Sequence, residues 1–374
     1  MVDRATGRRA VALDRVRAVA GAHQVPGVVL TRPSTVAWAS AGMNPPIDRT
    51  AGTDTVWLAV GPTGYTVIST LVEEPRLRAE LVPAGVEIVA VDWFDSDAFT
   101  SAAAAALNAR AAELASDGHP DFGVDVSEAL TRVRLSLSDT EQLDLEDLAR
   151  DATHAVESAL RTWTPGEPDF AVASRIAAGV EQVGAEPPVL LVGGDERLAR
   201  FRHPVANGAR PTDVVMAVLV ARRAGLHVAL TRYVGRRQSA EFTASLTTTQ
   251  RIHVNTLKAA RSHATYGDVM TKLAQEYDDA GAPGEWRYHY QGGPIGFLQR
   301  EFEIAPSQRD SIWWGEPITS GTALAFNPSL PGGFKDEDTY LVEPNGDLRW
   351  LTHSNDWPTV NVDGWLRPAV LVHD

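Results

Sequence analysis

Two long helical patterns followed directly by three strand patterns are the feature that most constrains the fold of this chain. Apolar residues recur at helical spacing across residues 138–183, and a Thr-Pro-Gly-Glu-Pro run at residues 164–168 interrupts them. Acidic side chains just after Ser138 favour a helix start there, because they interact well with the helix dipole. The strand patterns that follow are residues 189–192, 214–220 and 227–234. Helices on one side of a curved antiparallel sheet fit this order.

The N-terminal part of the chain alternates strand and helix patterns. Helical spacing is present at residues 10–24, and an alanine-rich helix is predicted over residues 99–115. The strand patterns are residues 27–30, 56–60, 65–69 and 86–91. This alternation predicts a small α/β domain over residues 1–132 and a second, α+β domain over residues 133–374. In the second domain, a helical block at residues 249–280 precedes a tail of short strands rich in Gly, Pro and Trp.

Charge and composition narrow the possible partners. The net charge of −14 argues against a nucleic-acid interface, which needs clustered Lys and Arg. The chain has no cysteine and therefore no thiol nucleophile or disulfide, which suits a reducing cytoplasm. No apolar run reaches the length of a membrane span, and the first residues lack the apolar core of a signal peptide. We therefore expect a cytoplasmic protein with neither nucleic-acid nor membrane partners.

A series of short segments in the C-terminal part follows an order that is typical of one known family. The segments are residues 131–138, His203-Pro204, 211–216, 224–232, 264–269, 289–296, 320–328 and 336–346. In this order they resemble the creatinase and Xaa-Pro aminopeptidase family (M24), whose fold is called pita-bread. The resemblance implies a small N-terminal creatinase-like α/β domain, a C-terminal pita-bread domain with a curved antiparallel sheet covered by helices, and a homodimer.

The resemblance also indicates where the family carries its metal ligands, and most of these positions differ here. Metal-binding members hold two divalent ions with two Asp, one His and two Glu, because hard cations need several oxygen ligands. The matching positions are Val218, Ala229, Gly293, Asn327 and Glu337. One carboxylate and one amide do not suffice for a metal pair, so we expect no metal and no other cofactor. Apolar side chains at the two Asp positions also predict a drier, less negative pocket.

Creatinase is the metal-free branch of this family, and it implies two catalytic residues. His203 falls near the creatinase catalytic His, and an imidazole is a natural acid–base group near neutral pH. Glu337 matches a Glu that contacts the creatinase substrate. Thr231 stands where creatinase has a second Glu, which argues against creatine as the substrate. Two plainer interpretations stay open: His203 is a surface-loop histidine, and Glu337 forms a salt bridge with Arg232.

Further residues are candidates for substrate binding. The rigid fork of Arg202 suits a carboxylate, although an exposed salt bridge is an alternative. Arg300 places a cation where relatives have a substrate-binding imidazole, which suits an acidic group of the substrate. Trp313 and Trp314 either wall the pocket or form an interface. The expected substrate-binding set is Arg202, Thr231, Arg232, His289, Arg300 and Asn327.

Three functional hypotheses follow. The first is a metal-independent, hydrolase-like enzyme in which His203 is the acid–base group and Glu337 orients a small C–N or amide-like substrate. The reaction is a hydrolysis, elimination, cyclisation or isomerisation, in a specialised biosynthetic pathway. The second is a catalytically inactive pseudo-peptidase that binds a ligand or protein. The third is an Xaa-Pro-type metallopeptidase whose ligands stand elsewhere in the sequence.

Overall fold

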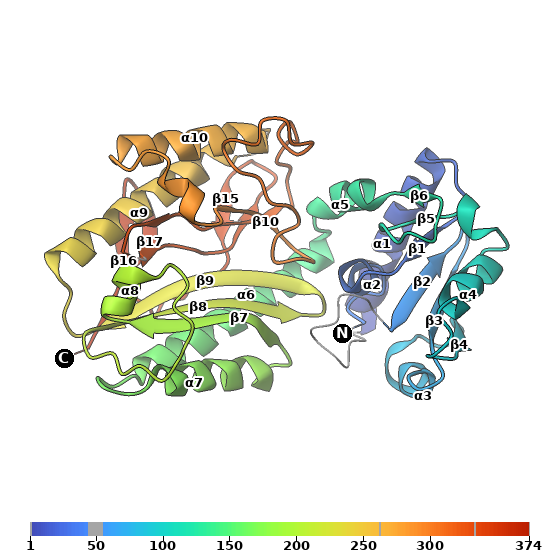
Figure 1. Ribbon diagram of the computed structural model, residues 1–374, viewed down its shortest axis with the longest axis horizontal. Coiled ribbons are helices and arrows are strands. Elements are labelled where there is room, and N and C mark those ends of the chain that lie inside the picture. Colours follow the sequence, from blue (N-terminus) through green and yellow to red (C-terminus); the bar gives the residue numbers. More distant parts are fainter. Residues whose placement is uncertain (1, 44–54, 262, 333, 374) are drawn as a thin grey trace. The chain divides into compact units, whose positions relative to one another are not determined.

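The computed structural model describes residues 2–43, 55–261, 263–332 and 334–373. The chain forms two compact units, Met1–Glu141 and Gln142–Asp374 (Figure 1). Of the helices in the described residues, none combines the length and apolar character needed to cross a bilayer.

The first unit is built on a six-stranded mixed sheet with the strand order β4-β3-β2-β1-β5-β6. Its strands are β1 (Val28–Leu30), β2 (Val56–Val60), β3 (Tyr65–Thr70), β4 (Glu87–Val91), β5 (Ala115–Ser116) and β6 (Val124–Asp125). Its helices are α1 (Val2–Ala22), α2 (Pro33–Ala39), the short α3 (Glu74–Arg76), α4 (Ala98–Ala106) and α5 (Ser127–Leu135). Helix α4 covers one face of the sheet, where Trp57, Ile68 and Ala103 form part of a buried cluster. The prediction that the N-terminal part has a small α/β fold is confirmed.

The alanine-rich helix is shorter than the sequence predicts. The expectation of a helix over residues 99–115 is wrong beyond Ala106, where α4 ends. Asn108 adopts a left-handed backbone conformation with φ of 48°, which Asn tolerates better than most residues and which stops a helix. Ala115 then pairs with Val28 in a parallel ladder. Strand pairing with a distant segment therefore overrides the local helix propensity of alanine.

The second unit contains the predicted helical pair and the three strands that follow it. Helix α6 (Asp139–Arg161) and helix α7 (Asp169–Gln182) precede β7 (Glu186–Gly194), short helix α8 (Glu196–Arg200), β8 (Val214–Arg223) and β9 (Leu226–Gly235). These strands form an antiparallel sheet, to which β18 (Leu371–Val372) adds a parallel edge. Helices α6 and α7 lie along one face of this sheet (Figure 1). The other face carries Val218 opposite Thr231, and Val220 opposite Ala229.

The predicted helical block at residues 249–280 is two helices. Helix α9 (Ala240–Ala259) begins after Ser239, whose side chain accepts a hydrogen bond from the Phe242 amide. Helix α10 (Tyr266–Asp279) begins after Thr265, which forms a capping box with Asp268. The capping box starts a second helix at Tyr266. The apolar spacing continues across the break between the helices, so the sequence pattern predicted one helical block.

The C-terminal segment forms the remaining short strands of the second unit. Strands β10 (Gly292–Ile295), β11 (Ala323–Phe326), β14 (Tyr340–Val342) and β15 (Leu348–Trp350) form an antiparallel sheet in that order. The pairs β12 (Ser329–Leu330) with β13 (Phe334–Lys335) and β16 (Thr359–Val362) with β17 (Trp365–Pro368) are separate hairpin ladders. Helix α9 packs against β11, β13 and β16, and α10 packs against α9. The backbone NH of Thr231 donates to the Glu337 carbonyl oxygen at 2.9 Å, which ties this part to β9.

Candidate functional site

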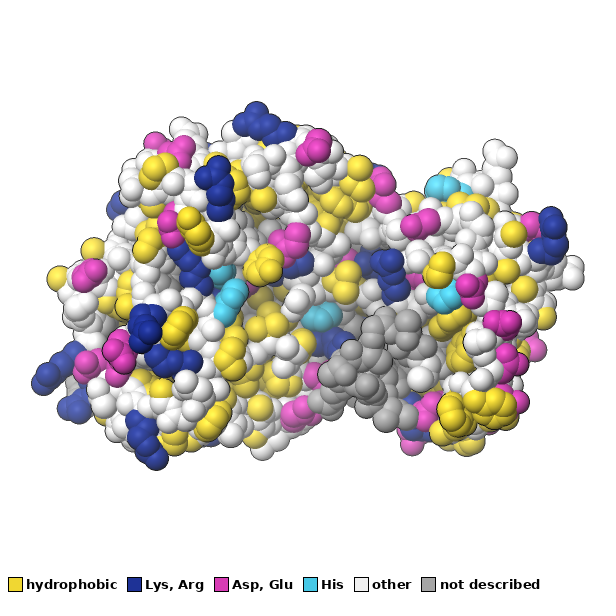
Figure 2. All heavy atoms as spheres, in the orientation of Figure 1, with side chains coloured by type: hydrophobic (Ala, Val, Ile, Leu, Met, Phe, Trp, Pro, Cys, Tyr) yellow, Lys and Arg dark blue, Asp and Glu magenta, His cyan; other side chains and the backbone are white. Residues whose placement is uncertain are grey.

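A cavity of about 360 Å³ lies within the second unit, between β7–β8 and the C-terminal segments. One wall is apolar and consists of Val189, Leu191, Val218 and Val220. The polar residues that line it are His203, Tyr290, Gln299, Arg300, Glu303, Asn327, Lys335 and Glu337. A neighbouring cavity of about 560 Å³ shares His203, Tyr290 and Glu303 with it. On the face of this unit drawn in Figure 2, hydrophobic side chains lie beside histidine and basic side chains.

His203 and His289 form a chain of hydrogen bonds that fixes their tautomers. The Nδ1 atom of His289 lies 2.9 Å from the Asn327 carbonyl oxygen, which can only accept, so this nitrogen carries the hydrogen. The Nε2 atom of neutral His289 is then an acceptor, and His203 Nε2, 3.1 Å away, donates to it. His203 therefore keeps its lone pair on Nδ1. Two residues far apart in sequence thus hold one imidazole as a base.

The charges around this pair keep both rings neutral. His203 lies in a loop and is exposed, as the surface-loop interpretation expects, but partial burial, followed by the charges of Lys335 and Arg202, lowers its pKa below the ordinary 6.5. Burial and Lys335 lower the pKa of His289 well below 6.5, because this ring is almost completely buried. Near pH 7 His203 is therefore available to accept a proton rather than to give one.

Glu337 pairs with Arg300 rather than with Arg232. The Arg300 Nη2 atom lies 2.9 Å from Glu337 Oε1, and the Glu337 side chain is 2% exposed. Arg300 also approaches Glu303, with 3.8 Å between Nε and Oε1. Burial and the Glu337 charge raise the pKa of Glu303 against the opposing effect of Arg300. The interpretation of Glu337 as a salt-bridge partner of Arg232 is wrong, because the two side chains bind different partners.

Lys335, like Tyr290, Gln299 and Glu303, is a polar cavity residue that the sequence analysis did not identify. Its side chain is 1% exposed, and among the described residues its ammonium group has no hydrogen-bond or ion-pair partner. Burial lowers its pKa to about 8, even though the nearby Glu337 charge acts in the opposite direction. A signal was present in the sequence: the chain contains three lysines, and one of them stands two residues before Glu337.

Three of the expected substrate-binding residues, Arg202, Thr231 and Arg232, line neither of the two cavities. Arg202 instead bonds to Glu285 and to the Ser329 carbonyl oxygen, the latter at 3.0 Å. Thr231 is buried on the cavity face of β9, opposite Val218, and its backbone NH bonds to Glu337. The expected residues that do line the cavity are His203, Arg300, Asn327 and Glu337, and His289 lines the neighbouring cavity.

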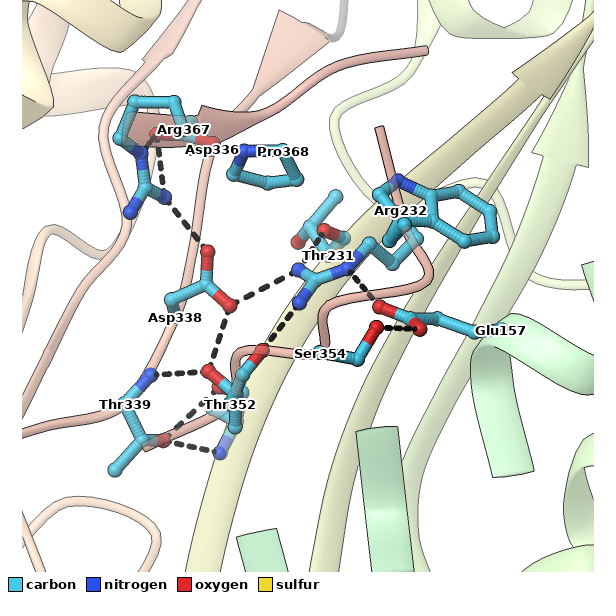
Figure 3. Close-up of polar contacts among 12 residues, drawn as sticks. Glu157, Thr231, Arg232, Asp336, Asp338, Thr339, Thr352, Ser354, Arg367 and Pro368 are labelled. Atoms are coloured by element: carbon cyan, nitrogen blue, oxygen red, sulfur yellow. Dashed lines mark hydrogen bonds and ion pairs between the residues drawn. The ribbon is translucent and has the colours of Figure 1, made fainter. Parts of the chain in front are cut away.

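Arg232 belongs to a buried ionic network on the opposite face of β9 (Figure 3). Successive strand residues point to opposite faces, so the residue after Thr231 points towards α6. Its Nε atom lies 3.1 Å from Glu157 Oε1, and its Nη1 atom lies 2.9 Å from Asp338 Oδ1. Arg367 continues the network, with 2.8 Å between its Nη2 atom and Asp338 Oδ2. Arg232 is thus a structural residue, and its expected contact with a substrate is not compatible with this position.

The residues at the family's metal-ligand positions do not fit a metal pair. Val218 and Asn327 line the cavity, but the first offers no ligand atom and the second only an amide. Among the five metal-ligand positions, Glu337 alone carries a carboxylate, and this carboxylate already forms an ion pair with Arg300. Across the described parts of the chain, no group of three or more His, Asp or Glu side chains is arranged to hold a metal ion. We therefore derive no chemical step through a metal.

Trp313 and Trp314 do not line either of the two cavities described above. The Trp313 ring stacks on Phe302 with 4.4 Å between ring centroids. The Arg309 guanidinium carbon lies over the Trp314 ring, 5.8 Å from the ring centroid. The backbone carbonyl oxygen of Trp314 accepts a hydrogen bond from the Gly267 amide. The pair thus packs within the second unit and does not wall these cavities, while the interface interpretation stays a prediction.

Solved structures reveal the fold that these elements form, although no protein-family model and no curated protein sequence matches the chain. Dipeptidase PepE from Mycobacterium ulcerans superposes with a TM-score of 0.75 and 20% identity, covering 98% of both chains. The chain has the pita-bread fold. An X-Pro aminopeptidase from Thermotoga maritima gives a TM-score of 0.74 at 13% identity over 96% of this chain and 99% of that one. The prolidase from Pyrococcus horikoshii gives 0.71 at 16% identity over 92% and 98%.

Proposed function

We propose that the cavity is the active site of a metal-independent enzyme that performs acid–base chemistry on a small C–N or amide-like compound. The observation that carries this proposal is the His203–His289–Asn327 chain, which leaves His203 Nδ1 unprotonated at neutral pH. The cavity volume of about 360 Å³ suits a small substrate.

His203 and Glu337 have separate roles in this proposal. His203 takes a proton from water or from the substrate at Nδ1, and His289 holds its ring in place. Glu337, itself held by Arg300, accepts a hydrogen bond from the nitrogen side of the substrate and so orients it. The apolar wall of Val218 and Val220 excludes water, which strengthens these polar contacts.

A panel of small amides, amidines and guanidino compounds, together with an Xaa-Pro dipeptide, tests the proposal. Protein prepared without added metal is expected to turn over one of the small C–N compounds. Substitution His203→Ala should reduce kcat/KM by about 10²–10⁴, the usual contribution of an acid–base group. His154→Ala is the matched control, because His154 is exposed on α6 and contacts Ser158 only at 3.4 Å.

Two outcomes would overturn the proposal. One is unchanged turnover in His203→Ala. The other is two bound metal ions per chain in native protein, together with loss of turnover after chelation. The pH profile adds a third readout: since the pKa of His203 is lowered from 6.5, the acid-side fall of kcat/KM should have its midpoint below pH 6.5.

The pairing of Glu337 with Arg300 favours a second candidate function, a binding module on the peptidase fold. A carboxylate held in an ion pair is less free to change partners during a reaction. This candidate predicts that a compound from the same panel raises the melting temperature without being converted. His203→Ala would then weaken binding and leave no turnover to lose.

A further inference from the structure

We propose that Lys335 is a nucleophilic amine that forms an imine with a small aldehyde or ketone bound in the 360 Å³ cavity. The inference rests on the surroundings of this one side chain. It stands independently of the acid–base role proposed for His203.

The first argument is the contrast among the three lysines of the chain. Lys258 bonds to the Asp363 carbonyl oxygen at 3.1 Å, and Lys272 forms an ion pair with Glu276 on the surface of α10. Lys335 lines the cavity with no such partner among the residues that the structure describes. Glu337 is near enough to favour its charged form but forms no ion pair with it, and a buried ammonium without a hydrogen-bonded partner is costly, so its presence calls for a ligand or a chemical role.

The second argument is the rigidity of the backbone that presents Lys335. The Tyr233 hydroxyl donates to the Lys335 carbonyl oxygen at 2.9 Å and accepts from the Lys335 amide at 3.0 Å. The residue also pairs with Ser329 in the β12–β13 ladder. A reactive group on a strand that is fixed from both sides needs little reorganisation to meet a bound carbonyl carbon.

The third argument is chemical. Burial lowers the pKa of Lys335, so a larger share of its amine is neutral near pH 7 than for a surface lysine. The Nζ lone pair attacks the carbonyl carbon, and the carbonyl oxygen takes up the proton that the nitrogen releases. The resulting hydroxyl group leaves as water after taking a proton from solvent, while the nitrogen lone pair forms the C=N bond and the nitrogen then returns its remaining proton to solvent. One amine and one carbonyl compound thus give one imine and one water.

Reductive trapping tests the proposal on wild-type protein. The protein is incubated near pH 7.5 with glyoxylate or propanal and cyanoborohydride, which reduces an imine to a stable secondary amine. Peptide mapping then compares the labelling rates of the three lysines in the same molecules. We expect Lys335 to react at least about tenfold faster than Lys258 and Lys272, given its lower pKa and its cavity.

The two probes distinguish what recognises the carbonyl compound. Faster labelling by glyoxylate shows that its carboxylate is bound, with Arg300 as the cationic cavity residue. Equal labelling by both probes shows that the carbonyl group alone is sufficient. Labelling of Lys335 at or below the rate of Lys258 with both probes overturns the proposal.

Variants complete the test without depending on one substitution. Lys335→Met and Lys335→Gln should each lose the rapid labelling at position 335 and keep the slow labelling of Lys258 and Lys272. Circular dichroism verifies that both variants are folded. Lys272→Met, which removes a surface amine, should keep the fast label. Because trapping is scored on the wild-type protein, its result is read separately from the turnover of His203→Ala, so the two proposals fail independently.

Discussion

At the scale of single residues, Lys335 illustrates how a cavity can retain an unfavourable group. The fall of its pKa from 10.5 to about 8 corresponds to about 3 kcal/mol between the protonated and neutral forms. Burial is the main cause, since Glu337 offsets part of it but binds Arg300. Local destabilisation of this kind is common where a site is kept for function rather than for stability.

This reasoning predicts that Lys335→Met stabilises the protein at neutral pH. The folded pKa lies below the unfolded one, so the wild-type protein gains stability as pH rises from 8 to 10.5. We expect Lys335→Met to raise the free energy of unfolding by about 1–3 kcal/mol at pH 7 and by much less at pH 10. Urea unfolding of both proteins at the two pH values measures this. If Lys335→Met is less stable than the wild-type protein at pH 7, or if its gain in stability does not shrink at higher pH, Lys335 is not a buried lysine with a lowered pKa.

At the scale of elements, the alternation of β9 separates a cavity face from a structural face. Thr231 faces the same side as Val218, whereas Arg232 enters the network with Glu157 and Asp338. Burial opposes the charge of Arg232, but Asp338 and Glu157 outweigh it and raise the pKa of this guanidinium. The ionic network therefore joins α6, β9 and the segment after β13.

Loss of Arg232 should destabilise the protein much more than loss of a surface arginine. Arg232→Met leaves Glu157 and Asp338 buried without their common cation, which costs about 3–5 kcal/mol. Arg349→Met is the control, because its ion pairs with Glu146 and Glu343 are partly exposed and contribute about 0–1 kcal/mol. Chemical denaturation compares the two. Similar effects of both substitutions would show that the network is not energetically special.

Strand β10 makes a second element-scale prediction. Gly292 has a φ of 85°, and a Cβ atom there would lie 2.1 Å from the Ala325 carbonyl oxygen of β11. Gly292→Ala should therefore cost about 3 kcal/mol or more, through backbone strain and the displacement of β11. Gly315→Ala is the control, since a Cβ atom at Gly315 meets nothing within 4 Å. Equal melting temperatures for the two variants would rule out this close approach.

At the scale of the whole molecule, histidines with a lowered pKa link stability to mildly acidic pH; His253 and His289 are buried, whereas His203 is exposed in its loop. Burial lowers the pKa of His203, His253 and His289, and at His253 the Arg367 charge and burial outweigh the attraction of Asp336. Below pH 6.5 the unfolded chain therefore binds protons that the folded chain does not. The same histidines that keep a base neutral in the site make the fold sensitive to acid.

The free energy of unfolding should accordingly fall as pH drops from 7 to 5. Asp336, whose pKa is lowered from 3.8, loses its contribution mainly below about pH 4, so this buried carboxyl group does not obscure the range. Urea unfolding across pH 5–7 measures the slope. His253→Gln should reduce the slope, and the exposed-site control His154→Gln should leave it unchanged. A flat stability profile would mean that these rings take up protons as readily in the folded protein as in the unfolded chain.

The sequence by itself determined the order of the elements and the fold. Periodic apolar spacing identified α6, α7 and the three strands that follow, because that spacing is a local property that the core only reinforces. The sequence also pointed to four of the polar cavity residues, His203, Arg300, Asn327 and Glu337, because they resemble family positions. The end of α4 escaped prediction, because a pairing with β1 decided it.

Only the tertiary structure decided what each charged residue does. Burial and ion pairing depend on segments distant in sequence: Glu337 pairs with Arg300, Arg232 pairs with Glu157, and Lys335 forms no ion pair within the described chain. The sequence lists these charges but not the solvent exclusion or the distances that set their energies. Since those two quantities govern pKa and pairing, the reactive groups of the site emerge only once the chain has folded.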